Sequence, residues 1–283
     1  MPEKSKRDRT LIIIGGHEDK DEDRIILKAV ATKTGGGKLV IVTAASNRQN
    51  ELADDYETVF RGLGVRHVYK LKIESREDAM SEKSVGILDD ADTVFFTGGD
   101  QLKITSQLGL TPVCLRLQEI YDSGGTIAGT SAGASVMSTT MMVGGTDQST
   151  MRLGEGVQLA PGLGFIDDVI IDQHFSERGR IGRLIGAVAQ NPRSLGIGID
   201  ENTAIVVEQG NRFSVIGEGG VCVIDGTDLS YSNITDEDSD RSLTVFDIKI
   251  HVLSQSDTFD CNTRRPTARP ADVAEKGILA GKA

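Results

Sequence analysis

The sequence predicts an α/β protein in which helices cover a mostly parallel central sheet, with short antiparallel strands toward the C-terminal end. Over residues 11–137, short and continuous apolar runs alternate with segments of helical character. Runs of this length that are rich in β-branched residues are typical of strands buried on both faces of a parallel sheet. Their alternation with helices indicates βαβ units. Beyond residue 203 the apolar runs are short and closely spaced, which favours antiparallel pairing.

The elements follow in order along the chain. Strands are expected at 11–14, 38–44, 65–73, 92–98 and 126–130, and helices at 24–32, 50–62 and 132–137. Strands at 169–173 and 195–201 are then separated by a helix at 180–190, and short antiparallel strands are expected at 204–207, 213–216, 221–224 and 244–253. Because no internal repeat or Pro/Ser-rich linker interrupts them, a single domain over 1–283 is expected, with about 262–283 as a loosely ordered tail.

The composition excludes several classes of protein. The 283 residues include 31 Lys and Arg against 42 Asp and Glu, for a formal net charge of −11, whereas nucleic-acid binding requires a basic face. No apolar stretch approaches the roughly 18–20 residues that span a bilayer. The apolar run at 11–14 is too short for a secretory signal. The three cysteines form no Cys-x-x-Cys pair, which favours free thiols in a reducing cytoplasm.

The segment from Gly129 to Gly133 matches the G-x-S-x-G nucleophile elbow, with Ser131 at its centre. In such an elbow a tight strand-to-helix turn lifts the serine hydroxyl out of the sheet. The next amide, that of Ala132, then points toward a developing oxyanion. The context fits, because an apolar run precedes the serine and a helix-compatible run follows it. A Gly/Ser-rich turn that binds a phosphate, or simply turns the chain, remains the alternative.

A serine nucleophile needs a base, and the sequence offers four histidines. Alternation over 244–253 places His251 on an exposed strand face, and His67 has no carboxylate or amide partner nearby in the sequence. His17 follows the first strand, so it fits a pocket residue better than a base. His174 closes a buried strand that turns polar at its C-terminal end. Since Ser131 also follows a strand, the two side chains are expected to meet at one edge of the sheet.

The third member should be a carboxylate that holds the imidazole in one tautomer. Glu201 follows another apolar strand that becomes acidic at its end, and Asp200 is its rival. These polar residues also fit a plainer interpretation as helix caps and loop residues. The order serine, histidine, acid differs from that of α/β-hydrolases, where the acid precedes the histidine. A lipase or esterase is therefore disfavoured.

Four motifs together make the chain recognisable. They are Phe96-Thr-Gly-Gly-Asp-Gln101, Gly129-Thr-Ser-Ala-Gly-Ala-Ser135, Asp172-Gln-His-Phe-Ser-Glu-Arg178 and Gly198-Ile-Asp-Glu201. With them the chain resembles the cyanophycinases among the peptidase E-like serine peptidases. The resemblance covers nearly the whole length, from the Gly15-Gly-His-Glu-Asp-Lys20 motif to the strands beyond Glu201. The four motifs are far more specific together than any one alone.

The resemblance implies a three-layer αβα sandwich, flavodoxin-like, with a catalytic triad of Ser131, His174 and Glu201. It implies an exopeptidase that hydrolyses cyanophycin, a poly-aspartate with arginine on each β-carboxyl, to β-aspartyl-arginine dipeptides. It also implies that no metal or cofactor is required, a homodimer, and a cytoplasmic location. The residues implied to line the substrate pocket are Gln101, Asp172, Gln173, Arg178, Arg180 and Arg183.

The residues themselves agree with this mechanism. His174 would take the proton of Ser131, and Glu201 would stabilise the resulting imidazolium. The oxyanion would be held by the N–H of Ala132 and by that of Gly99, whose glycine-rich loop follows a buried strand and permits close approach.

A zwitterionic substrate that carries arginine needs both signs of charge in the pocket. Asp172 is the expected partner for a guanidinium, and Arg178 is the expected partner for a carboxylate. Helical spacing places Arg180 and Arg183 largely opposite the apolar face of their helix. A solvated helix face is therefore an equal alternative for these two arginines.

Two other functions remain open at this point. One is a peptidase E-type dipeptidase that removes N-terminal aspartate, which would need a narrower pocket. The other is a nonenzymatic nucleotide or phosphate binder that uses 129–133 as an anion-binding loop. The second is disfavoured, because the chain has no P-loop lysine and no G-x-G-x-x-G after its first strand.

Overall fold

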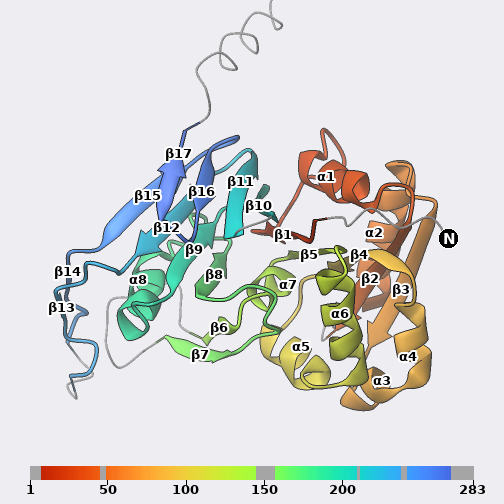
Figure 1. The fold of residues 1–283 in the computed structure, drawn as a ribbon, viewed down its shortest axis with the longest axis horizontal. Helices are drawn as coiled ribbons and strands as arrows, with labels where there is room; N and C mark the ends of the chain where they lie inside the picture. Colours follow the sequence, from red (N-terminus) through yellow and green to blue (C-terminus); the bar gives the residue numbers. More distant parts are fainter. Residues whose placement is uncertain (1–7, 45–48, 145–156, 209–210, 237–240, 269–283) are drawn as a thin grey trace, which may run out of the picture.

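The central feature of the fold is a mixed nine-stranded sheet (Figure 1). The computed structural model describes residues 8–44, 49–144, 157–208, 211–236 and 241–268. One half of the sheet is parallel, in the order β1 (Thr10–Ile14), β5 (Thr126–Thr130), β4 (Ala91–Phe96), β2 (Lys38–Ala44), β3 (His67–Ile73). The other half is antiparallel and continues from β1 through β10 (Thr203–Glu208), β11 (Arg212–Gly217), β16 (Thr258–Asp260) and β17 (Arg265–Thr267). The predicted α/β class, with antiparallel strands following a parallel core, is confirmed.

A second sheet of four strands is separate from the first in its hydrogen bonding. Its order is β15 (Lys249–Leu253), β12 (Val221–Asp225), β9 (Leu195–Ile199), β8 (Val169–Gln173), and only β8 and β9 are parallel. Two short ribbons accompany it, formed by β6 (Thr140–Gly144) with β7 (Gln158–Pro161) and by β13 (Tyr231–Ser232) with β14 (Val245–Phe246).

The helices form layers on both faces of the parallel half (Figure 1). Helices α1 (Ile25–Thr34) and α2 (Gln49–Gly62) pack on one face. The opposite face is covered by α3 (Arg76–Met80), α4 (Glu82–Ile87), α5 (Gln101–Leu108), α6 (Pro112–Asp122) and α7 (Ala132–Ser135). The second sheet joins the same apolar core as that opposite face, and α8 (Ile181–Gln190) packs on the other side of the second sheet. The parallel half therefore has the helix–sheet–helix layering that the resemblance implies.

The division into two sheets corrects the expected position of the site. The strands before Ser131 and His174 were expected in one sheet, but β5 belongs to the large sheet and β8 to the second. The parallel series stops at β1, because β10 occupies its far side in antiparallel register, with Ile14 opposite Ala204. β8 consequently pairs with β9, and β9 pairs on its other side with β12. In the order β3-β2-β4-β5-β1, the first four strands follow the flavodoxin-like pattern 2-1-3-4, and β1 takes the fifth place.

Four helices between residues 76 and 122 were not anticipated, although each has a clear start signal. Ser75 forms a capping box with Asp78, and Ser81 caps α4. Asp100 accepts the amide of Lys103 at the start of α5, and Thr111 caps α6 ahead of a proline in its first turn. These helices carry the crossover connections between β3, β4 and β5.

Two further expectations concern the C-terminal end and membranes. A loose tail was expected over about 262–283, but residues 265–267 form strand β17 at the edge of the large sheet. Residues 269–283 lie outside the described residues. Among the helices that the structure describes, none is both long enough and apolar enough to cross a membrane.

Candidate active site

Ser131 stands at a sharp turn between β5 and α7. Its backbone has φ 54° and ψ −117°, a strained conformation for a residue with a side chain. Its amide is held by the carbonyl of Ile14 at 3.1 Å. The flanking glycines are required by close packing, since a Cβ on Gly129 would lie 2.5 Å from the Gly133 carbonyl oxygen. This is the geometry that the G-x-S-x-G pattern predicts.

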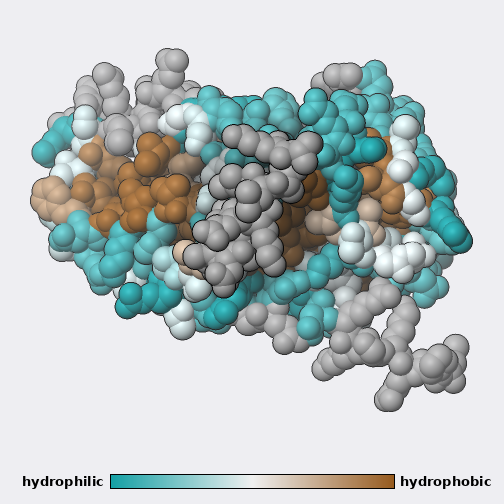
Figure 2. Space-filling view, turned by 90° about the horizontal axis from the view of Figure 1, so that it is seen from above, coloured by the Kyte–Doolittle hydropathy of each residue, from teal (hydrophilic) through white to brown (hydrophobic). Residues whose placement is uncertain are grey.

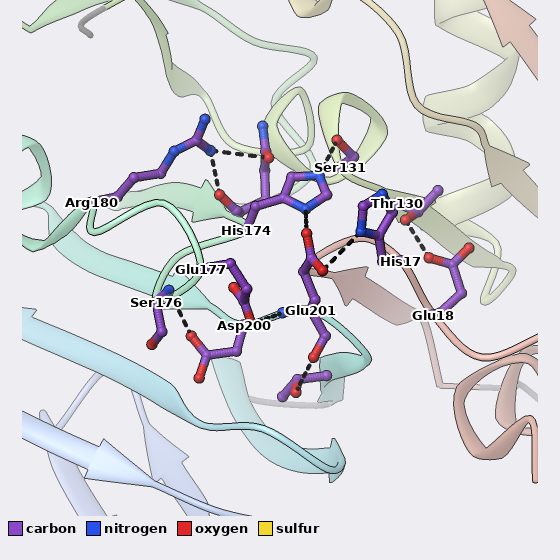
Figure 3. A network of polar contacts seen from close by, with 12 residues as sticks. His17, Glu18, Thr130, Ser131, His174, Ser176, Glu177, Arg180, Asp200 and Glu201 are labelled. Atoms are coloured by element: carbon purple, nitrogen blue, oxygen red, sulfur yellow. Dashed lines mark hydrogen bonds and ion pairs between the residues drawn. The ribbon is translucent and has the colours of Figure 1, made fainter. Parts of the chain in front are cut away.

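His174 follows β8 and reaches Ser131 across the junction between the two sheets. Its Nε2 lies 3.0 Å from Ser131 Oγ (Figure 3). Its backbone has φ 49°, and its amide is bonded to the carbonyl of Gly15 at 2.8 Å. The imidazole is almost fully buried, with 6% of the side chain exposed. The backbone of His174 is thus held by the segment that follows β1, and its ring faces the serine.

Glu201 follows β9 and completes a continuous chain of polar contacts. Its Oε1 lies 2.6 Å from His174 Nδ1 (Figure 3). Its rival, Asp200, has a structural role, because its two oxygens accept the amides of Ser176 at 3.0 Å and Gly220 at 2.9 Å. The carboxylate that faces the histidine is therefore that of Glu201.

His17, which the sequence favoured as a pocket residue and disfavoured as the base, is also part of this network. Its Nδ1 lies 2.8 Å from the second oxygen of Glu201, and its ring meets that of His174 edge to face at 5.0 Å. Unlike His174, it is open to solvent, with 73% of its side chain exposed. Glu201 therefore shares its two oxygens between two imidazoles (Figure 3). The Gly15-Gly16 pair at the end of β1 was the available signal for this position.

The backbone of Gly15 and Gly16 joins the separate segments of the site. The carbonyl of Gly15 accepts the amide of His174, and that of Gly16 accepts the amide of Asn202 at 2.9 Å. Asn202 is the residue directly after Glu201. Two consecutive carbonyls at the end of β1 thus fasten the histidine and the glutamate in place.

The surroundings of the site shift the acidity of both titratable partners. Burial lowers the pKa of His174, the charge of Arg178 lowers it further, and the Glu201 carboxylate opposes both. Burial raises the pKa of Glu201, but hydrogen bonds from His17 and His174 outweigh it and hold that pKa below its ordinary value. Near neutral pH the histidine is therefore available as a base, and the glutamate is charged.

Asp172 lies at the centre of a buried ionic cluster beside the site. The Nε of Arg183 donates to Asp172 Oδ2 at 2.6 Å, its Nη2 donates to the other oxygen, and Arg180 donates to Asp172 Oδ1 at 3.3 Å. Arg180 also donates to the carbonyl and side-chain oxygens of Gln173. All four residues are buried. The solvated helix face considered for Arg180 and Arg183 is therefore wrong, since both guanidinium groups point inward to a carboxylate.

Two other residues named from the sequence, Arg178 and Gln101, are at least partly accessible to solvent. Arg178 is exposed, and Gln101 is half-buried with its amide donating to the carbonyl of Met142 at 3.0 Å. The loop that contains Gly99 passes close to the serine, since a Cβ on Gly98 would lie 3.5 Å from Ser131 Cβ. Within the described parts of the chain, the amides of Gly99 and Ala132 have no hydrogen-bond acceptor.

One buried acid was not singled out from the sequence. The Glu18 side chain lies among β1, β5 and α2, where it accepts hydrogen bonds from the hydroxyl of Tyr56 and, at 2.6 Å, from that of Thr130. Thr130 directly precedes Ser131, so Glu18 anchors the turn that presents the serine (Figure 3). Its place in the Gly15–Lys20 motif was the only sequence signal.

The arrangement has the form of a proton-transfer chain. If His174 Nδ1 carries its proton toward Glu201, then Nε2 is left to accept the proton of the Ser131 hydroxyl. A serine activated in this way is a nucleophile for an acyl carbon.

Residues 11–215 match the model of peptidase family S51. The chain belongs to peptidase family S51.

Known proteins extend this assignment. The S51 peptidase described here is 39% identical over 264 residues to a cyanophycinase from Nostoc sp. strain PCC 7120, covering 92% of this chain and 88% of the relative. It is 36% identical over 259 residues to a cyanophycinase from Synechococcus elongatus, covering 90% and 80% respectively. Among solved structures, a peptidase from an acI-B1 Actinobacterium superimposes with a TM-score of 0.60 at 23% identity, over 87% of this chain and 98% of that one. The last comparison supports the fold alone.

Proposed function

We propose that this S51 peptidase is a cyanophycinase that releases β-aspartyl-arginine dipeptides from cyanophycin through Ser131, His174 and Glu201. The observation that carries the proposal is the unbroken chain from Ser131 Oγ through the imidazole to Glu201, with separations of 3.0 and 2.6 Å. The relatives named as cyanophycinases support the substrate, because they match over almost the whole chain.

In the proposed reaction, Ser131 Oγ attacks a backbone carbonyl of the polymer while His174 Nε2 takes the hydroxyl proton. The amides of Ala132 and Gly99 hold the oxyanion. The imidazolium, stabilised by Glu201, gives its proton to the amine nitrogen as the C–N bond breaks. The acyl group then remains attached to Ser131 as an acyl-enzyme. A water molecule then attacks the acyl carbon with His174 again as base, and the product acid departs with the serine restored.

The charges around the serine suit a substrate with both signs of charge. Arg178 is exposed beside His174 and is proposed to meet a substrate carboxylate, with Gln101 and Gln173 as further contacts. Asp172 was expected to hold the substrate guanidinium, but its oxygens are already engaged by Arg180 and Arg183. In this proposal Asp172 instead fixes the two arginines that form the wall of the pocket.

The test compares the protein with a Ser131→Ala variant on purified cyanophycin, with dipeptide release followed by mass spectrometry. The proposal predicts β-aspartyl-arginine from the wild type and a loss of roughly 10⁴-fold or more in the variant. Ser135→Ala is the matched control, since it removes a hydroxyl from the same motif and leaves Ser131 in place. Hydrolysis of short Asp-X dipeptides without attack on the polymer would move the function to a peptidase E-type dipeptidase. Unchanged hydrolysis by Ser131→Ala would reject the serine mechanism.

We also propose that the protein acts as a homodimer in the cytoplasm, as the resemblance implies. An exposed apolar area on the second sheet and its ribbon suits such an interface (Figure 2). It includes Phe246, Ile250 and Val252, which are exposed. Sedimentation of the wild type and of Val252→Asp tests this proposal, which predicts a dimer that the added charge dissociates. A monomeric wild type would contradict it.

A further inference from the structure

Three side chains of the site also form a potential metal-binding group. One ligand atom from each of His17, His174 and Glu201 can be chosen so that all three atoms lie within 4.8 Å of one another. We propose that a divalent transition-metal ion such as Zn²⁺ binds these three residues and reversibly inhibits the enzyme. The binding site stands on this geometry alone, whereas its inhibitory effect rests on the proposed serine peptidase function.

The donor set selects the class of ion. Two imidazoles and one carboxylate are ligands that suit Zn²⁺ and its neighbours, with the fourth position left for water. Mg²⁺ and Ca²⁺ prefer sites made of oxygen atoms and are not expected to compete at similar concentrations.

The site is nearly formed without the ion. Bonds of about 2.0–2.2 Å in a tetrahedral arrangement place neighbouring donor atoms roughly 3.4 Å apart. His174 Nδ1 lies 2.6 Å from Oε1 of Glu201 and His17 Nδ1 lies 2.8 Å from Oε2, while one donor atom of each residue lies within 4.8 Å of the other two. The separations between donor atoms therefore have to change by at most roughly 1.5 Å to fit one ion.

Access and mobility are provided by His17. Its side chain is 73% exposed, and its Nδ1 contacts the Glu201 carboxylate, so an ion can reach that carboxylate from solvent. The backbone amide of His174 is held by the Gly15 carbonyl, and the amide that follows Glu201 is held by the Gly16 carbonyl. The ion thus meets two fixed donors, and the third donor can adjust.

Binding would remove the base without any change in the covalent chain. In the active form, His174 Nδ1 carries the proton and Nε2 accepts from Ser131. An ion on Nδ1 requires the neutral imidazole to carry its proton on Nε2 instead, so no net proton is gained or lost on that ring. Nε2 then donates to Ser131 and cannot accept its proton. The charge of Glu201 is at the same time neutralised by the ion.

The experiment uses the full chain after treatment with EDTA. ZnCl₂ is titrated into a hydrolysis assay, and Co²⁺ is titrated separately while its visible absorption is recorded, because tetrahedral Co²⁺ has a distinctive spectrum. The expected results are inhibition by Zn²⁺ that EDTA reverses, no inhibition by Mg²⁺ at the same concentration, and a tetrahedral Co²⁺ spectrum.

The decisive variant is His17→Asn. Asparagine tolerates the positive φ of 46° at this position and keeps an N–H for Glu201, but it is a poor ligand for Zn²⁺. Measured against its own metal-free activity, it should need at least about 10-fold more Zn²⁺ for half inhibition. His67→Ala, which removes an exposed histidine of β3, is the matched control and should keep the wild-type sensitivity.

The outcomes separate this inference from the proposed function. Equal Zn²⁺ sensitivity of His17→Asn and wild type, or the absence of a tetrahedral Co²⁺ spectrum, would overturn the metal site even if hydrolysis is normal. If the wild type shows no peptidase activity but binds Co²⁺ in a manner that His17→Asn weakens, the site stands and the proposed function fails.

Discussion

The imidazole of His174 lies directly against Gly16, with no space for a side chain between them. A Cβ atom on Gly16 would be 2.3 Å from Cε1 of the ring and 2.6 Å from its Nε2. Nε2 is also the atom that faces Ser131. The glycine therefore determines where the proposed base, His174, stands relative to the proposed nucleophile, Ser131.

Gly16→Ala should displace the imidazole and impair hydrolysis. A shift of about 1 Å at a reacting group can cost roughly 10²-fold, and we expect a decrease in kcat/KM of that size. Gly16 also has a positive φ of 109°, which alanine adopts poorly. Gly36→Ala is the control, because Gly36 has φ 82° but nothing lies within 4 Å of its added Cβ. Equal losses of activity in both variants would mean that backbone strain, and not the contact with His174, is responsible.

Glu201→Gln should retain the shape of the site and lose its charge. The amide can no longer stabilise the imidazolium or fix the productive tautomer, so kcat should fall by about 10³–10⁴-fold. Asp200→Asn should behave differently, since Asp200 bonds two backbone amides and not the histidine. We expect it to lower the melting temperature with a much smaller change in kcat. A larger effect of Asp200→Asn on kcat would reassign the acid of the triad.

The pH profile of hydrolysis should show that the charge of Arg178 lowers the pKa of His174. His174 must be neutral to accept a proton, and its pKa lies below the ordinary 6.5 because of burial and then the charge of Arg178. Hydrolysis should therefore persist below pH 6.5 and decline only as the pH falls through that lowered pKa. Arg178→Ala removes the cation, so the acid limb of kcat/KM should move to higher pH, whereas Arg178→Lys should leave it in place. A limb that stays unmoved in Arg178→Ala would show that the charge of Arg178 does not lower the pKa of His174.

The buried cluster should be essential for stability. Arg183→Ala leaves the buried Asp172 carboxylate with Arg180 as its remaining cationic partner and the Gln173 amide as a neutral donor, so we expect a loss of about 3 kcal/mol in the free energy of unfolding. Urea unfolding monitored by circular dichroism measures this loss. Arg178→Ala, which removes an exposed arginine four residues after the base, should change stability by less than about 0.5 kcal/mol. Matching stabilities for the two variants would show that the cluster contributes nothing to folding.

Sequence patterns correctly indicated that the polar site residues follow strands, but they did not indicate to which sheet each strand belongs. The apolar runs before Ser131, His174 and Glu201 were correctly expected as strands, because full burial on both faces leaves a continuous apolar run. Those runs do not encode which strand pairs with which. The antiparallel contact of β1 with β10, which separates the two sheets, therefore had no local signal.

The face of an alternating strand is equally ambiguous. Alternation over 244–253 suggested that His251 faces solvent, but His251 is half-buried beside Phe259, with ring centroids 5.6 Å apart. Ile250 and Val252, on the opposite face of β15, are exposed. The inner face of the second sheet packs against the large sheet and covers the histidine side. Alternation defines two faces, and only packing decides which of them is covered.

The junction between the two sheets also affects when the protein can become active during its synthesis. Ser131 is supported by β1 and β5, but β1 pairs on its other side with β10, and the strand before Glu201 lies between β8 and β12. Chains fold from the N-terminal end as they leave the ribosome. A growing chain can form the serine turn long before residues 203–225 arrive to bring the histidine and glutamate beside it. Ser131, His174 and Glu201 can therefore come together only after residues 203–225 have been synthesised.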